Sequence, residues 1–319
     1  MKNLRLLLLL PLILFSCKKG SNPSKTPPTP TPGSADKVTR TIRLDSDYYP
    51  TKYVYEEYRY NDTGMVTRYI KYEVDSGTHP VHKDTIQVIT FDYAYGDTSR
   101  RPGYALENYR TSLYHLANAA HQYFYDKQGR LVLDTLIAFY QYNSSYPSTD
   151  RGVVISRRIS YSASSITVTN INLDTKTGVK GSYNDFIELD GNGNPVNVST
   201  LNGRDFVTGD QDNYNVAGFA ANGYAYGPLS NSLHKMNVSN IMAFVQTGFP
   251  GGSFYASYLA KNAFVNSKSS APGIVNSIIT NFQFTTDASN KTLIRKVSFS
   301  RPGENEHGGY ESFIYDTPF

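Results

Sequence analysis

The sequence has no tryptophan and only one cysteine, at position 17. A single cysteine excludes an internal disulfide, so packing alone must stabilise the folded part. The histidines lack the short, fixed spacing of a zinc site, and no second cysteine is present to complete one. We therefore expect no metal site and no cofactor. We expect the six histidines at the surface or in hairpins: His79, His82, His115, His121, His234 and His307.

Recognisable catalytic patterns are also missing. The chain has no Gly-x-Ser-x-Gly nucleophile elbow, and its glycine-rich run 248–252 is not followed by the Lys-Ser/Thr pair of a phosphate loop. Adjacent carboxylates such as Glu56 and Glu57 point to opposite faces of a strand and cannot share a substrate. No catalytic residue is therefore assigned, although side chains from distant strands could still converge in space.

The excess of positive charge is confined to the start of the chain. The formal net charge is +4, and five basic residues precede Asp36: Lys2, Arg5, Lys18, Lys19 and Lys25. Removing these five from the 31 lysines and arginines leaves one base fewer than the 27 aspartates and glutamates, a net of −1. A nearly neutral domain does not provide the basic face that nucleic-acid binding needs. We expect no nucleic-acid partner.

The first residues have the pattern of an export signal. Lys2 and Arg5 precede an apolar run over 6–15, which is too short to span a membrane alone, and the small residue Ser16 follows it. The lone Cys17 directly after this pattern resembles the lipobox of bacterial lipoproteins. That resemblance implies removal of residues 1–16 and a diacylglycerol on Cys17. The alternative is an ordinary secreted precursor.

A tether follows the cysteine. Residues 17–36 contain five prolines spaced by Ser, Thr, Asn and Gly, so almost nothing in this segment can be buried. Proline favours extended polyproline II at ~3.1 Å per residue, which gives the tether a reach of roughly 50 Å. We therefore divide the chain into a signal peptide (1–16), a lipidated tether (17–36) and a single β-rich domain (37–319), with the membrane as a partner.

The domain has the composition of an antiparallel β protein. It is rich in Thr, Ser, Asn and Gly, and the whole chain has 27 Tyr and 16 Phe. Apolar residues alternate with polar ones, as at Ile89, Phe91, Tyr93 and Tyr95, which is typical of a half-buried antiparallel strand. The predicted fold class is all-β and mainly antiparallel. We expect a curled meander of hairpins, an open barrel or a sandwich, with one or two short helical segments.

Three turns share an Asn/Asp-x-x-Gly pattern, beginning at Asn61, Asp126 and Asp190. The first side chain can bond back to the turn amides, and the glycine can take the positive φ that other residues resist. Each copy is predicted to be a hairpin, with turn-structural roles for five residues: Gly64, Asp126, Gly129, Asp190 and Gly193. A weaker fourth copy runs over 284–293.

The second of these turns, in the segment Tyr125–Leu131, is similar to the YD repeat of large bacterial shell and wall-associated proteins. The whole chain resembles Bacteroidetes lipoproteins of unknown function, which combine a Ser-Cys-Lys-Lys start, a Thr/Pro-rich tether and degenerate YD-like hairpins. The resemblance implies an architecture and a compartment: lipid-anchored at the outer membrane. Residues 18–22 lack the acidic run of surface-exported members, which leaves both the periplasmic face and the cell surface open.

Two segments depart from the β pattern. Apolar residues at nearly helical spacing predict helices within 229–245 and 106–120, which would cover one face or end of the sheet.

Asp190 also begins a run similar to a calcium loop. However, Pro195 stands where glycine is needed and Leu201 where a bidentate glutamate belongs, so a turn explains the run better.

Three functions remain open. The first is a lipid-anchored envelope protein that acts as a non-enzymatic binding or scaffold module, with a possible glycan or envelope protein as partner. The second is a glycan-binding lipoprotein of a polysaccharide-uptake system, because tyrosines stack on sugars and Asn, Asp and Gly loops bind hydroxyls. The third is a hydrolase whose site forms only in three dimensions.

Overall fold

The computed structural model shows one compact unit over Gly33–Phe319. The residues that it describes are 37–45, 52–77, 80–94, 99–110, 114–142, 151–175, 178, 180–201, 221–244, 257–270, 278–286, 294–300 and 308–315. Cys17 and the whole tether lie outside these residues, so their roles stay predictions. Within the described residues no helix combines the length and apolarity needed to cross a membrane.

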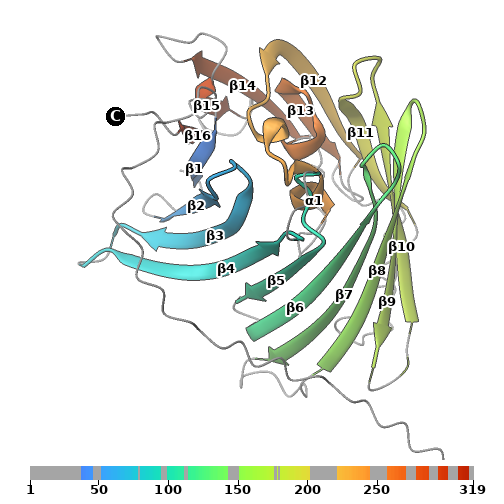
Figure 1. The fold of residues 1–319 in the computed structure, drawn as a ribbon. Coiled ribbons are helices and arrows are strands. Elements are labelled where there is room, and N and C mark those ends of the chain that lie inside the picture. The colour runs from blue at the N-terminus through green and yellow to red at the C-terminus, as the bar shows by residue number, and fades with distance from the viewer. Residues whose placement is uncertain are drawn as a thin grey trace, which may run out of the picture. The chain divides into compact units, whose positions relative to one another are not determined.

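Sixteen strands build the unit (Figure 1). They are β1 (Val38–Asp45), β2 (Lys52–Tyr60), β3 (Val66–Asp75), β4 (His82–Asp92), β5 (Tyr104–Tyr109), β6 (Tyr114–Tyr125), β7 (Leu131–Tyr142), β8 (Arg151–Tyr161), β9 (Ser165–Asp174), β10 (Lys180–Leu189), β11 (Pro195–Leu201), β12 (Ala221–Ser230), β13 (Asn262–Ser270), β14 (Ile278–Thr286), β15 (Ile294–Ser300) and β16 (Gly308–Tyr315).

The strands form one antiparallel meander that closes on itself. Each strand pairs with the next along the chain, and β1 pairs with β16 through contacts such as Thr41 with Phe313. The predicted antiparallel β class is confirmed. The β1–β16 ladder closes the sheet into a barrel, and this closure was not predicted from the sequence.

Alternation along each strand separates an inner from an outer face. In β6, Ala119, His121 and Tyr123 are buried, whereas Gln122 and Phe124 between and beside them are exposed. Residues that lie directly opposite on neighbouring antiparallel strands share a face. The register therefore carries this inner face from strand to strand around the barrel.

A segment between β12 and β13 fills part of the interior. It contains the 3-10 helix η2 (Leu233–Lys235) and the short helix α1 (Ser239–Phe244), and Figure 1 shows α1 within the curve of the wall. The apolar side chains of this segment are buried together with apolar residues from many strands, and all of them form one hydrophobic core. Sixteen-stranded barrels are too wide for their own side chains to fill. This plug supplies the missing volume with Leu233, Met236, Val238, Ile241, Met242 and Phe244.

The plug confirms helical structure inside the predicted segment 229–245, but the helix predicted at 106–120 is wrong. That segment lies in β5 and β6, which pair with each other from Tyr104–Gln122 to Tyr109–Ala117. The apolar residues Leu106 and Ala120 are opposite each other on the outer face, and Leu106 is 50 % exposed. Leu106 and Ala120 therefore belong to the outer wall of the barrel and not to a helix face that packs on the core.

Candidate functional site

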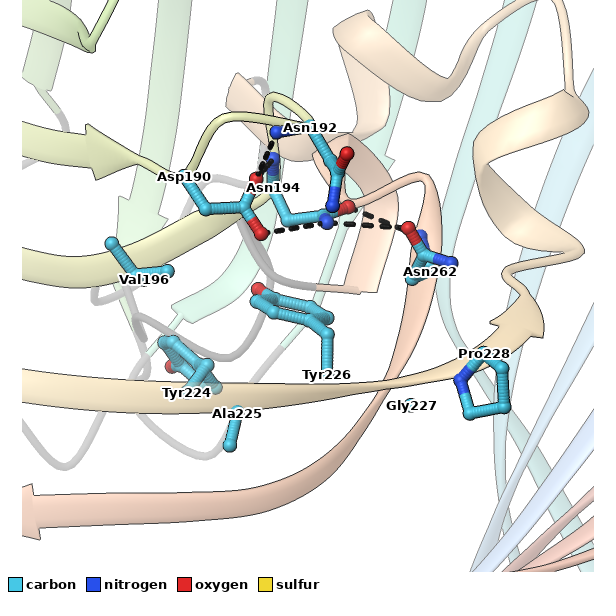
Figure 2. A pocket seen from close by; sticks show the side chains of 10 residues that line it. All are labelled: Asp190, Asn192, Asn194, Val196, Tyr224, Ala225, Tyr226, Gly227, Pro228 and Asn262. Atoms are coloured by element: carbon cyan, nitrogen blue, oxygen red, sulfur yellow. Dashed lines mark hydrogen bonds between the residues drawn. The ribbon is translucent and has the colours of Figure 1, made fainter.

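The candidate site is a pocket where two neighbouring strands separate. The ladder between β11 and β12 contains only two residue pairs, Asn197 with Gly223 and Val198 with Asn222. Pro195, at the start of β11, has no amide hydrogen to extend this ladder. The resulting gap holds a pocket of about 370 Å³ (Figure 2).

One wall of the pocket is the turn between β10 and β11. The Oδ1 atom of Asp190 accepts hydrogen bonds from the backbone amides of Asn192 (2.9 Å) and Asn194 (2.8 Å), and its Oδ2 accepts one from the Asn194 side chain (3.0 Å). Burial would raise the pKa of Asp190, but these hydrogen bonds, led by those from Asn194, lower it below its usual range. Asp190 therefore stays charged while its oxygens hold the turn together.

Asn194 connects this turn to the start of β13. Its Oδ1 accepts hydrogen bonds from the backbone amides of Lys261 (2.8 Å) and Asn262 (3.1 Å), while its Nδ2 also donates to Asn262 Oδ1 (3.2 Å). The Lys261 ammonium donates to the carbonyl of Asn192 at 2.7 Å. These bonds hold two segments of the wall, the turn and the start of β13, in one arrangement, although Asn194 and Asn262 are 68 positions apart.

The opposite wall belongs to β12, where Tyr224 and Tyr226 line the pocket (Figure 2). The hydroxyl of Tyr226 donates to the carbonyl of Pro195 across the gap. Tyr224 packs edge-on against Phe264, with ring centroids 5.7 Å apart. Both rings are therefore held in place, and burial raises the pKa of each tyrosine well above its usual value. Neither phenol acts as a base at neutral pH.

The pocket leaves two amides available to a ligand. Within the described part of the chain, the side-chain amide of Asn192 makes no hydrogen bond and is exposed, and the Nδ2 of Asn262 has no acceptor. Each amide carries two donors and an acceptor oxygen. The site therefore presents hydrogen-bonding amides beside aromatic rings, and its one carboxylate is occupied by the turn.

A second polar cluster is sealed inside the barrel. His121 Nε2 lies 3.0 Å from Glu107 Oε2, and its Nδ1 lies 3.1 Å from Asp134 Oδ1. Arg157 donates to Asp134 Oδ2 at 2.9 Å, and Gln87 donates to Glu107 Oε1 at 2.5 Å. These five residues come from the consecutive strands β4 to β8, and all are buried. The expectation of a surface or hairpin position is therefore wrong for His121.

This cluster carries no catalytic base. Burial alone would lower the pKa of His121, but the carboxylates of Asp134 and Glu107 outweigh burial and raise it to about 9. The ring is protonated at neutral pH, with both nitrogens donating to carboxylates, and it is completely enclosed. Two carboxylates facing two cations leave the cluster formally neutral, which makes the burial of four charges tolerable.

The turn residues singled out in the sequence lie in turns between consecutive strands. Gly64, Gly129 and Gly193 have φ of 76°, 78° and 82° and lie in the three tight hairpin turns. The carboxylate of Asp126 accepts hydrogen bonds from the backbone amide of Arg130 (2.8 Å) and from its guanidinium (2.7 Å). Asp190 lines the pocket and Gly193 lies in the same turn, so one of the three turns also contributes to the candidate site.

The other two histidines whose side chains the structure describes have separate partners. His82 is exposed and lies 3.4 Å from Asp84, and His234 is partly buried beside the carbonyl of Tyr258. Within the described residues no group of three His, Cys, Asp or Glu side chains is arranged to hold a metal ion. His79 and His307 lie outside the described residues, as does the side chain of His115.

Solved structures share this fold. A porin-like protein from Bacteroides uniformis is similar over 88% of this chain and 98% of its own, with 11% identity and a TM-score of 0.50. A porin-like protein from Bacteroides vulgatus is similar over 88% of this chain and 99% of its own, with 9% identity and a TM-score of 0.52. At these identities the likeness shows the fold alone. No protein-family model and no curated protein matches the sequence.

Sequence reasoning missed Asn192, Asn262 and Tyr226 as one site. The Asp190 turn carried a signal, because its first residue matched the other two turns while the following residues were unusually rich in asparagine. Nothing in the sequence connected this turn with β12 or β13. Glu107 was missed because it lies in the segment 106–120, which was predicted to be helical. His121 follows that segment and was expected at the surface or in a hairpin.

Proposed function

We propose that this protein is a lipid-anchored, non-enzymatic binding module of the cell envelope, at the periplasmic face or the surface of the outer membrane. The pocket between β11 and β12 carries the proposal, because it is an open hollow in which side-chain amides lie beside two tyrosine rings that are held in place. Small-molecule sites typically combine a few well-placed polar groups with aromatic walls.

The sequence pattern before Cys17 supports anchoring through lipid. Lys2 and Arg5, the apolar run over 6–15 and the small residue Ser16 precede the one cysteine of the chain. We assign membrane attachment to Cys17.

Side chains fill part of the barrel interior. The plug packs its apolar side chains against the inner face, and the Glu107–His121–Asp134 cluster is enclosed among the strands. We place the ligand at the edge of the barrel, where β11 and β12 separate, because the described pocket lies there.

A non-enzymatic role fits the state of the ionisable groups. Protonated His121 has no free lone pair, Asp190 is occupied by turn amides, and the raised pKa values of the two pocket tyrosines keep them neutral. General acid–base chemistry needs a group that can exchange protons within reach of substrate near the working pH. The pocket offers hydrogen bonds and ring faces instead.

The anchor is tested by replacing Cys17 in the full-length chain. Cys17→Ser should remove labelling by a radioactive fatty acid and leave an uncleaved precursor. Ser16→Ala, which keeps a small residue before the cysteine, should be labelled and processed like the wild type. Normal processing and labelling of Cys17→Ser would refute the lipid anchor.

The binding role is tested by a ligand panel of neutral sugars, uronic acids, peptides and phospholipid headgroups, measured by ligand-observed NMR on the full-length protein. At least one probe should bind, and Asn192→Ala should weaken the binding of that probe. Turnover of a probe, abolished by a change in the pocket, would instead favour the hydrolase.

A further inference from the structure

We propose that the pocket between β11 and β12 binds one ring of an uncharged sugar, with Tyr226 as its stacking surface and Asn192 and Asn262 as its hydrogen-bonding groups. This inference rests on the proposed binding function and specifies the ligand class for the same site. Three properties of the pocket support it: its charge, its pattern of donors and acceptors, and its rigid aromatic wall.

The charges around the pocket are already engaged. Three hydrogen bonds from the turn occupy the oxygens of Asp190, and Lys261 directs its ammonium to the carbonyl of Asn192. An anionic ligand would meet the Asp190 carboxylate in the wall, and a cationic one would compete with the three turn hydrogen bonds for the same two oxygens. An uncharged ligand requires no rearrangement of these bonds.

The available polar groups match hydroxyls. A hydroxyl donates one hydrogen bond and accepts others, and an amide side chain can meet both needs with its oxygen and its NH₂ group. Asn192 and Asn262 come from different elements, the β10–β11 turn and the start of β13, and both line the pocket. Two amides on separate elements can bond neighbouring hydroxyls of one ring.

The aromatic wall is fixed before any ligand arrives. The hydroxyl of Tyr226 is tied to the Pro195 carbonyl, and Tyr224 is packed against Phe264. A ring that is already ordered loses little entropy when a flat apolar surface packs on it. The C–H face of a sugar is such a surface, and the volume of about 370 Å³ is at the small end of ligand sites, roughly 300–1,000 Å³.

The other turns of the same type provide internal comparisons. Thr63 and Gln128 occupy the position that Asn192 has in its turn. The ladders β3–β4 and β7–β8 near those turns each contain eight residue pairs, whereas β11–β12 contains two. The pocket therefore depends on the separation of β11 and β12 and not on the turn alone.

The test uses the full-length protein in a detergent without a sugar headgroup. The probes are the methyl glycosides of glucose, galactose, mannose and N-acetylglucosamine, together with glucuronic acid, followed by saturation-transfer NMR and titration. A neutral glycoside should bind with a dissociation constant on the order of 1 mM, as expected for a ligand of this size. Glucuronic acid should bind more weakly.

Three variants locate the binding. Asn192→Ala should weaken it about threefold to tenfold, the effect of one lost hydrogen bond, and should fold normally because its side chain holds no part of the turn. Tyr226→Leu should weaken it further, whereas Tyr226→Phe should retain most of it by keeping the ring. Gln128→Ala, at the matching position of another turn, should change nothing.

The outcomes separate this inference from the binding function. Equal affinity in wild type and Asn192→Ala, no binding of any neutral glycoside, or a preference for glucuronic acid overturns the sugar assignment. If a peptide or headgroup binds instead and Asn192→Ala weakens it, the sugar assignment is wrong and the binding role stands. If no probe of any class depends on Asn192, both fail.

Discussion

The hydroxyl of Tyr125 donates a 2.7 Å hydrogen bond to the carbonyl of Pro102, 23 residues earlier in the chain. Tyr125 ends β6, and Pro102 lies just before β5 begins. The bond therefore ties the end of one strand to the start of its neighbour, beside the Asp126–Gly129 turn. The guanidinium of Arg101 lies over the same ring, 5.8 Å from its centroid.

The same tie recurs around the barrel. Four other tyrosines reach back 22 to 31 residues to the carbonyl at the start of the preceding strand: Tyr60 to Val38, Tyr93 to Val66, Tyr161 to Leu131 and Tyr226 to Pro195. Lys37 and Arg130 also lie over the rings of Tyr60 and Tyr161. These tyrosines therefore have a structural role, because each one ties two neighbouring strands together.

The first prediction concerns this tie. Tyr125→Phe removes only the hydroxyl and should lower the free energy of unfolding by roughly 0.5–1.5 kcal/mol, because the Pro102 carbonyl loses its partner. Urea denaturation measures the change. Tyr104→Phe, on a ring that is 39% exposed, should leave stability unchanged. An equal effect of both substitutions would refute a specific role for the tie.

The second prediction concerns the adjacent glycine. Gly129 has a φ of 78°, and a Cβ built on it would lie 1.8 Å from the Arg101 guanidinium. Gly129→Ala should therefore cost on the order of 1 kcal/mol from the backbone conformation, with a further loss as Arg101 is displaced from Tyr125.

Gly191→Ala provides the matched control. Gly191 lies in the equivalent type of turn, its φ is not positive, and a Cβ there would have no atom within 4 Å. The melting temperature of the Gly191→Ala variant should stay at or slightly above the wild-type value. If Gly129→Ala and Gly191→Ala lost stability to a similar extent, these turns would tolerate no side chain at either position. The positive φ of Gly129 would then not explain the loss in Gly129→Ala.

The strands and turns could be predicted from the sequence because their signals are local. Alternation at Ile89 and Phe91 reports one buried face of one strand, and the Asp126–Gly129 pattern reports a backbone conformation within four residues. Closure could not be predicted in this way. It depends on pairs such as Thr41 with Phe313, which no local pattern connects.

The pocket and the buried cluster around His121 could not be predicted from the sequence, for two related reasons. Asn194 and Asn262 meet because β13 returns beside the β10–β11 turn, and this approach depends on the whole meander. His121 and Glu107 contradict the rule that buried positions are apolar. Only their mutual pairing makes burial possible, and that pairing exists only once β5, β6 and β7 are side by side.

The third prediction is that the Asp190 turn binds no calcium tightly. Its carboxylate oxygens already accept hydrogen bonds from Asn192 and Asn194, and Leu201 stands where a calcium loop needs a bidentate glutamate. Calcium at millimolar concentration should leave the melting temperature unchanged in the wild type and in Asp190→Asn. A calcium-dependent rise that vanished in Asp190→Asn would contradict this.

The fourth prediction is a loss of stability at alkaline pH caused by His121. The pKa of His121 is about 9 in the folded state and near 6.5 in an unfolded chain. A pKa raised by folding gives a stabilising contribution that is complete below pH 6.5 and is lost as pH rises through 9. By linkage the loss is on the order of 3 kcal/mol.

Urea denaturation between pH 6 and 10 measures this slope, and an NMR titration of the His121 ring should give a midpoint near 9. His82→Gln alters a histidine whose side chain is 65% exposed and should preserve the slope. His121→Gln should be less stable at pH 6, because Glu107 and Asp134 lose their cation, and should lose less stability above pH 7. If His121 titrates near 6.5 in the folded protein, its pairing with two buried carboxylates is wrong, whatever the stability of the variants.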